Sequence, residues 1–203
     1  FYADTMKGGH NLNDPALVRT LTTHAKDAVA WLVSLGADLN TVGRAGGAKY
    51  PRAHRPTDGS AIGPEVIRVL WKAAKDRKMD VRTQTRATEI IMKDGRVAGV
   101  KATTKDGKVY TIDAKAVVLA TGGFGANQDM LVKYQPKLKG YATTNQPGAT
   151  GDGIILAEHA GAALVDMKQI QAHPTAAPDG TLISESVRGD GGILINAEGK
   201  RFT

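Results

Sequence analysis

Two Asp-Gly turns in the middle of the chain constrain its fold more than any other feature of the sequence. Asp94-Gly95 and Asp106-Gly107 each lie between short segments in which apolar and polar residues alternate, a pattern typical of β-hairpins. These turns predict an antiparallel meander of short strands. The segments expected as strands are residues 81–83, 87–92, 97–103 and 109–112.

A different kind of strand is predicted directly after the meander. Residues 116–120 are continuously apolar, as expected of a strand that is buried on both faces. The run ends in Thr121, Gly122 and Gly123, and small residues at the carboxyl end of such a strand let a ligand approach the backbone. The loop lacks the GxGxxG fingerprint of dinucleotide sites, and a plain left-handed turn would have the same sequence. The pattern alone leaves both interpretations open.

Helical patterns surround these strands. Asp14 as N-cap, Pro15 at the first helical position and Gly36 as terminator predict a long helix, whose broad apolar stripe should be covered by the core. Together the elements predict an α/β fold with α+β elements. The other expected elements are a helix from about residue 64, helices over residues 127–134 and 154–160, and a strand at residues 193–196.

Residues 43–63, between the first two helices, are predicted to form a long loop. The segment is rich in glycine and proline and carries four basic or imidazole side chains. Loops of this length within a compact domain are usually functional or disordered. The four side chains are Arg44, Arg52, His54 and Arg55.

The amino-acid composition limits the kinds of site and ligand that this chain can have. The 203 residues contain no cysteine, which excludes disulfides, thiolate zinc sites and cysteine nucleophiles, and no metal site is predicted. A net charge of +7 suits a small anionic substrate, whereas an aromatic content of 5% provides few stacking platforms for a nucleic acid. No apolar run approaches the roughly 20 residues that a membrane helix needs. A small anionic ligand is therefore favoured over a nucleic acid or a membrane.

Two groups of polar residues are candidates for binding or chemistry. Asp152 precedes a predicted helix, where it could cap the helix or reach a ribose or ribityl hydroxyl. His173, Ser184, Glu185 and Arg188 combine an imidazole, a hydroxyl, a carboxylate and a guanidinium, which are the parts of an anion site with a proton relay. A surface ion pair between Glu185 and Arg188 explains the second group equally well.

A set of short motifs runs in order along almost the whole chain. The motifs are Asp4-Thr-Met-Lys-Gly-Gly9, Asn13-Asp-Pro-Ala, Trp31 with Gly36-Ala-Asp, His54-Arg-Pro-Thr, Ala120-Thr-Gly-Gly-Phe, Pro147-Gly-Ala-Thr-Gly-Asp-Gly, Gln171-Ala-His-Pro-Thr and Glu185-Ser-Val-Arg-Gly. Together they closely resemble the flavoprotein part of the soluble fumarate reductases. These are the flavocytochrome c type within the fumarate reductase/succinate dehydrogenase family of FAD proteins.

The resemblance implies that the chain is an internal piece of a longer flavoprotein. The family begins with a strand–GxGxxG–helix unit that holds the FAD pyrophosphate, and it continues into a capping domain that supplies an arginine as general acid. Residues 1–140 would be the middle part of an incomplete Rossmann-like FAD-binding domain. Residues 141–203 would be the FAD-domain return and the start of the capping domain. FAD is the cofactor expected in the parent, whereas this piece should hold it weakly or not at all and be inactive alone.

The resemblance also assigns roles to individual residues. His173 and Ser184 match residues that bind the substrate. Glu185 and Arg188 match a carboxylate and a guanidinium that relay a proton in catalysis. The residues that match FAD contacts are Ala87, Thr121, Gly122, Gly123 and Asp152.

The implied activity is the FAD-dependent reduction of an unsaturated carboxylic acid, with fumarate to succinate as the preferred reaction. Ala45 and Leu182 stand where the fumarate-reducing flavocytochromes carry methionines. Urocanate or another enoate therefore remains an alternative substrate, and a non-catalytic FAD-fold module remains an alternative class. The implied partners of the parent are the small acid and an electron donor, which would be a haem domain, a cytochrome or a quinone-linked protein. The expected location is the periplasm, with the cytoplasm as the alternative.

Overall fold

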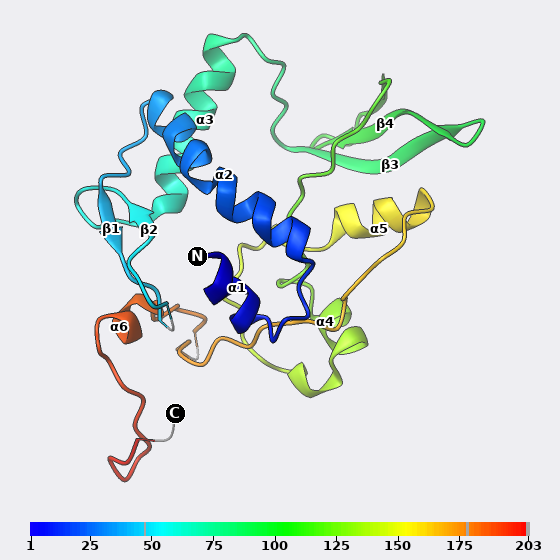
Figure 1. Cartoon of the computed structure of the whole chain (residues 1–203). Coiled ribbons are helices and arrows are strands. Elements are labelled where there is room, and N and C mark those ends of the chain that lie inside the picture. Colours follow the sequence, from blue (N-terminus) through cyan, green and yellow to red (C-terminus); the bar gives the residue numbers. More distant parts are fainter. Residues whose placement is uncertain (47, 178, 202–203) are drawn as a thin grey trace. The chain divides into compact units, whose positions relative to one another are not determined.

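The predicted meander is a three-stranded antiparallel sheet in the computed structural model, which describes residues 1–46, 48–177 and 179–201 (Figure 1). The sheet has the order β3-β4-β5, formed by β3 (Thr85–Lys93), β4 (Arg96–Thr104) and β5 (Val109–Asp113). Asp94 and Gly95 have φ angles of 51° and 74°, which a two-residue hairpin turn with left-handed central residues requires. The hairpin prediction is confirmed.

Two of the strands predicted in and directly after the meander are wrong. Residues 81–83 are not a strand, because the ladder begins with Thr85 opposite Thr104 and extends no further. Residues 116–120 are also not a strand, and Val118 is 88% exposed. A strand needs a hydrogen-bonded neighbour, and no segment in the described part of the chain pairs with this run.

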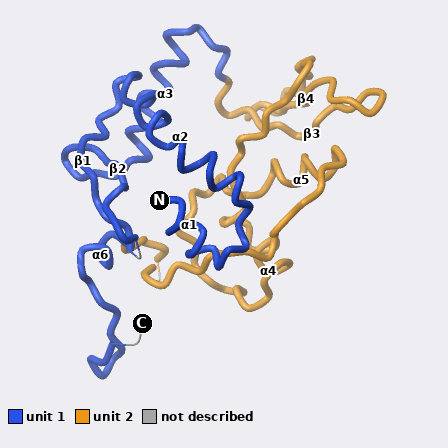
Figure 2. The backbone as a smooth tube through the Cα atoms, in the orientation of Figure 1, with its two compact units in different colours: residues 1–81, 184–203 blue, residues 82–183 orange. Residues whose placement is uncertain are grey.

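The described chain divides into two compact units, which Figure 2 shows in different colours. The first unit comprises residues 1–81 and 184–203, and the second comprises residues 82–183. This division concerns backbone contacts within the chain. The predicted boundary at residues 140 and 141 concerns the domains of a longer protein and stays a prediction.

The first unit contains the long helix that was expected. Helix α2 (Pro15–Ser34) begins after Asp14, whose carboxylate accepts hydrogen bonds from the Ala16 and Leu17 amides at 2.8 and 3.3 Å. Gly36 follows the helix with φ at 93°, a left-handed conformation that suits glycine. The other elements of this unit are α1 (Tyr2–Gly8), β1 (Thr41–Gly43), β2 (Ala53–Arg55), α3 (Ile62–Asp76) and α6 (Ser186–Gly189).

The apolar stripe of α2 is covered only in part, contrary to expectation. Val18 is buried, whereas Leu17 and Leu21 are 69% and 56% exposed. Towards its C-terminal end, the helix packs against a small apolar core centred on Val69 of α3, which is fully buried. The remaining members of this core are Ala37, Leu39, Val29, Leu32 and Leu35.

The predicted loop 43–63 contains structure that the sequence did not reveal. β1 and β2 pair as an antiparallel hairpin in which Thr41 lies opposite Arg55 and Gly43 opposite Ala53. Three-residue strands lack the length that produces a recognisable alternation of apolar and polar residues. The strand expected at residues 193–196 is also wrong, since this segment forms only an isolated bridge between Ile195 and Arg201.

The second unit adds α4 (Gln128–Tyr134), the 3-10 helix η1 (Pro136–Leu138) and α5 (Asp152–His159) to the sheet. Helix α4 begins as expected, because the Asn127 side chain accepts a hydrogen bond from the Met130 amide at 3.0 Å. Helix α5 contacts β3. Gly151, with φ at 79°, precedes α5, so Asp152 is its first residue and not its cap.

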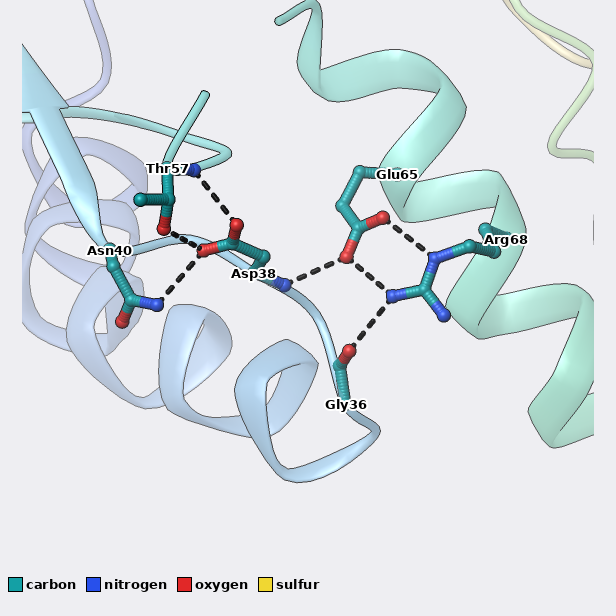
Figure 3. Close-up of polar contacts among 6 residues, drawn as sticks. All are labelled: Gly36, Asp38, Asn40, Thr57, Glu65 and Arg68. Carbon is teal, nitrogen blue, oxygen red and sulfur yellow. Dashed lines mark hydrogen bonds and ion pairs between the residues drawn. The ribbon is translucent and has the colours of Figure 1, made fainter. Parts of the chain in front are cut away.

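A polar network joins α3 to the segments that flank it in the first unit (Figure 3). Glu65 accepts a hydrogen bond from the Asp38 amide at 2.7 Å and pairs with Arg68 at 2.6 Å. Arg68 also donates to the Gly36 carbonyl at 2.9 Å. The Asp38 carboxylate in turn accepts from the amide and hydroxyl of Thr57 at 2.8 and 2.7 Å. These bonds hold the ends of α2, β2 and α3 together.

The network makes the stability of the first unit sensitive to acid. The Arg68 guanidinium, and then the Asp38 amide, lower the pKa of Glu65 from 4.5 to about 2. Because the pKa is lower in the folded state, this stabilisation is fully present above pH 4.5 and is lost as the pH falls towards 2. Denaturant unfolding of the wild type and Glu65→Gln should therefore give a difference in unfolding free energy that shrinks over this range.

The control is Asp76→Asn, which breaks the exposed ion pair with Lys72 on the same helix. Exposed pairs of this kind contribute little, so this variant should unfold much like the wild type. A Glu65→Gln deficit that stays constant down to pH 2 would contradict the prediction.

Candidate active site

Three of the predicted catalytic and substrate-binding residues lie together around α6 in the first unit. Ser184 precedes this helix, Glu185 is its N-cap residue and Arg188 lies in its last turn. Arg188 Nη2 lies 3.8 Å from Glu185 Oε2, a loose ion pair one helical turn apart. The side chains of Glu185 and Arg188 are 47% and 25% exposed, so both are open to a ligand or to water. The arrangement places a carboxylate beside a permanent cation.

The Ser184 hydroxyl has a local structural role. It donates to the Ser186 hydroxyl at 3.2 Å and accepts from the Ser186 amide at 3.2 Å. The second bond gives the first amide of α6 a partner, which that amide lacks within the helix. Ser184 therefore shapes the turn that carries Glu185 and Arg188. A role in binding the substrate stays a prediction.

The β1–β2 hairpin holds the α6 turn in place. Arg44, directly after β1, donates from Nε and Nη2 to the Gly189 carbonyl at 2.9 and 2.6 Å. Arg55, in β2, donates to the Ser186 hydroxyl at 2.8 Å. A side chain at Gly189 would collide with the Arg44 carbonyl, so only glycine permits this approach. Both arginines belong to the basic loop predicted from the sequence, and no local pattern there indicates that they bond to α6.

His173 lies in the second unit, separate from the unit that contains α6. Its Nδ1 accepts a hydrogen bond from the Thr175 amide at 3.3 Å. Because a backbone amide only donates, the proton of the neutral ring must lie on Nε2, which can then donate to an anion. His173 also lines a cavity of about 310 Å³ together with apolar side chains such as Leu131 and Ile170. That His173, Glu185 and Arg188 form one site stays a prediction.

The predicted FAD contacts converge within the second unit. Arg86, next to Ala87 in β3, pairs with Asp152 of α5 at 2.8 Å. The Thr121 side chain packs directly on Gly153 in the first turn of α5. The Gly123 carbonyl accepts a hydrogen bond from the Gly151 amide at 3.1 Å. The structure thereby brings the glycine loop, the start of α5 and the first residues of β3 to one place.

Asp152 is not the helix cap considered from the sequence, and its contact with a ribose or ribityl hydroxyl stays a prediction. Its carboxylate accepts from Arg86 and from the Thr150 hydroxyl, which lies 2.8 Å away. Arg86 first, and Thr150 second, lower the pKa of Asp152. The group is therefore an anion at neutral pH and can accept a further hydrogen bond. Arg86 was missed in the sequence because its partner lies far away along the chain.

The residues around Asp152 fit a dinucleotide. No atom lies within 4 Å of a methyl group added at Gly122 or Gly123, so a flat or phosphorylated ligand can approach the backbone there. β3 is an edge strand of its sheet, so its outer backbone groups are not paired with another strand in the described chain. An ionised Asp152 provides an acceptor for a sugar hydroxyl. These are three elements of a nucleotide site.

Ala45 and Leu182, the two departures from the methionine pattern, lie in different units. Ala45 lines a cavity of about 550 Å³ with Val29, Arg52 and His54. Leu182 is half exposed and forms an isolated β-bridge with Ala176.

In the described part of the chain, no helix combines the length and the apolar character that spanning a membrane requires. Within the same residues, no group of three His, Asp or Glu side chains is placed to hold a metal ion.

Sequence comparison assigns the family. The profile of the family described as "FAD binding domain" matches residues 1–203. The chain belongs to this FAD-binding family. The predicted resemblance and fold class are confirmed, and the comparison supports FAD as the cofactor.

Members of this family with curated names are similar to the chain over nearly its whole length. It is 51% identical to "Fumarate reductase (cytochrome)" of Shewanella frigidimarina, over 99% of this chain and 36% of that protein. It is 46% identical to "NADH:fumarate oxidoreductase" of Klebsiella pneumoniae, over 100% of this chain and 22% of that protein. The chain therefore spans about a third or less of the length of these relatives.

A solved structure of the family has the same fold. The open conformation of a flavocytochrome c3 fumarate reductase superposes with a TM-score of 0.87 and 44% identity. The match covers 100% of this chain and 36% of that chain. A quinol-fumarate reductase with menaquinol molecules superposes with a TM-score of 0.83 and 29% identity.

The contact between Thr121 and Gly153 yields a prediction for the full-length protein that contains this chain. Alanine normally stabilises a helix relative to glycine by about 1 kcal/mol. In Gly153→Ala, however, the added methyl group would displace the Thr121 side chain. We expect denaturant unfolding to show lower stability, and FAD fluorescence titration to show weaker binding.

Gly63→Ala in α3 is the matched control, because no atom lies within 4 Å of the new methyl group. It should raise stability by up to about 1 kcal/mol and leave FAD binding unchanged. An equal gain in stability from Gly153→Ala would disprove the packing argument.

Proposed function

We propose that the protein containing this chain is an FAD-dependent reductase of an unsaturated carboxylic acid, and that it converts fumarate to succinate. The observation that carries the proposal is the α6 turn, which holds a carboxylate beside a guanidinium in a chain of the FAD-binding family. Similarity to proteins named as fumarate reductases, over 99% of this chain, supports the choice of substrate.

Reduction of an activated alkene adds a hydride to one carbon and a proton to its neighbour. FAD, when bound and reduced by the electron donor, would supply the hydride. The second unit would hold it through Ala87, Thr121, Gly122, Gly123 and Asp152.

The residues of this chain would perform the remaining tasks. The Nε2–H group of the neutral His173 ring and the guanidinium of Arg188 are suitable donors to the carboxylates of the substrate. Ser184 offers a hydroxyl. Such donors stabilise the enolate-like charge that develops as the alkene is reduced. Glu185, held near Arg188, can accept a proton from water and pass it towards the substrate.

Another enoate is the second candidate substrate. Ala45 lines an open cavity of about 550 Å³, where a larger side chain would leave less room. The chain is also 38% identical to "NADH:acrylate oxidoreductase" of Vibrio harveyi over 92% of its length. A urocanate-sized or acrylate-type acid therefore belongs in any substrate screen, and a non-catalytic FAD module is the alternative outcome.

The proposal extends to partners and location. We propose that the whole protein receives electrons from a haem domain, a cytochrome or a quinone-linked protein, following the relatives named above. We also propose a periplasmic location, with the cytoplasm as the alternative. Cell fractionation with antibodies to this chain would distinguish the two compartments.

The test is to purify the full-length protein that contains this chain, measure its flavin content, and assay it with a chemically reduced dye. We expect bound FAD and oxidation of the dye that depends on fumarate. Faster turnover with urocanate or acrylate would move the assignment to another enoate. Bound flavin without turnover on any of the three acids would favour a non-catalytic module.

Replacement of the relay carboxylate should act mainly on the chemical step. We expect Glu185→Gln to lower kcat by roughly 10²–10⁴-fold, as is typical for a positioned acid–base group. KM should change little, because the neutral amide keeps the size of the side chain. Steady-state kinetics at saturating reduced dye would measure both constants.

Glu198→Gln provides the control, because Glu198 is also an exposed glutamate, with an ion pair to Lys200 at 3.3 Å. It should retain the kinetic constants of the wild type. Near-normal kcat in Glu185→Gln would show that the contact of Glu185 with Arg188 is only a surface ion pair.

A further inference from the structure

Helix α6 cannot hold its own shape. It has four residues, and isolated helices much longer than this are marginal in water. Apolar packing provides little support, since Val187 is 54% exposed and the buried residue of the helix is Gly189. The position of Glu185 and Arg188 must therefore depend on polar contacts from elsewhere in the first unit.

The strongest of these contacts comes from Arg44. Its Nε and Nη2 atoms both donate to the Gly189 carbonyl, at 2.9 and 2.6 Å, in a partly buried setting. This carbonyl lies at the C-terminal end of α6, where the carbonyl groups lack partners and a cation is favoured. Two bonds from one rigid guanidinium fix both the position and the orientation of the acceptor.

The backbone next to Arg44 supports the same turn. A methyl group at Gly46 would lie 3.0 Å from the Glu185 carbonyl oxygen and 3.4 Å from Arg188 Cβ. A methyl group at Gly189 would collide with the Arg44 carbonyl. The segment around residues 44–46 thus contacts the α6 turn from its N-cap to its last residue.

We infer that Arg44 is the positioning residue of the Glu185–Arg188 pair. It fixes the pair by holding the end of α6, since its guanidinium bonds to the Gly189 carbonyl and not to the side chain of Glu185 or Arg188. This role rests on the proposed function. Arg44 keeps the Glu185 carboxylate in the orientation that proton transfer requires, and its removal slows the proton transfer without weakening the binding of the substrate. Misplacement by about 1 Å is enough to slow such a step roughly 10²-fold.

The first experiment tests the contact itself, without any assay of activity. Hydrogen exchange of the full-length protein is followed by mass spectrometry in peptides that cover residues 184–192. Arg44→Lys keeps the charge but cannot donate two hydrogen bonds in the fixed geometry of a guanidinium. We therefore expect hydrogen exchange over residues 184–192 to become roughly tenfold to a hundredfold faster. The amides that report include Gly189 and Asp190, which donate to Glu185 and Ser186 at 3.0 and 2.8 Å.

Arg77→Lys is the matched control. Arg77, the C-cap residue of α3, also donates to a backbone carbonyl near a helix end. Its acceptor is the Ala73 carbonyl of α3, at 3.1 Å. Replacement of Arg77 should leave exchange over residues 184–192 and the kinetic constants unchanged. Unchanged exchange in Arg44→Lys would overturn the inference.

The second experiment tests the consequence for catalysis. Arg44→Lys should lower kcat roughly tenfold to a hundredfold and leave KM within about twofold. In a Glu185→Gln background, the same change should alter kcat by less than about twofold, because the group that Arg44 positions is already absent. Equal loss in both backgrounds would show general structural damage and would overturn the inference.

A second variant and the exchange data separate the role of Arg44 from misfolding and from the proposed function. If Arg44→Lys fails to fold, Ser186→Ala removes the acceptor of Arg55 at the other end of α6 and should produce a smaller effect of the same kind. A wild-type protein without reductase activity would refute the proposed function, whereas the exchange experiment would still decide whether Arg44 holds α6. Normal kcat in Arg44→Lys with an active wild type would refute the positioning role alone.

Discussion

The segments that carry the candidate chemistry are too short to hold their own shape, and this constraint governs the structure. α6 has four residues, and β1 and β2 have three each. Segments of this length bury little apolar surface and form few internal hydrogen bonds. Their geometry therefore depends on side chains that bond to backbone groups of other segments. The Arg44 guanidinium on the Gly189 carbonyl is the clearest case.

The same principle operates in the second unit, with different partners. There the ion pair between Arg86 and Asp152 joins β3 to α5, and the Thr121 side chain packs against Gly153. Each contact links a strand or loop to the first turn of α5, where the candidate FAD contacts gather. One unit thus organises the residues suited to holding a dinucleotide, and the other organises the Glu185–Arg188 ion pair.

The elements that were predicted correctly share one property, which is that local interactions determine them. α2 follows from the cap at Asp14 and the proline after it, and the β3–β4 turn follows from Asp94-Gly95. The errors occur where a distant partner decides the outcome. Residues 116–120 have the composition of a buried strand, yet no described segment pairs with them. The β1–β2 hairpin was missed because its strands are too short to show a period.

The sequence by itself determined the family, the main helices, the antiparallel sheet and the types of residue available for chemistry. Motif order, capping residues and turn residues are local properties, and they can be read without knowing what lies nearby in space. The tertiary structure alone decided that Arg44 and Arg55 hold α6, and that Asp152 pairs with Arg86 instead of capping its helix. These contacts join residues that lie far apart along the chain. No local pattern encodes such a pairing, because it exists only once the backbone has folded.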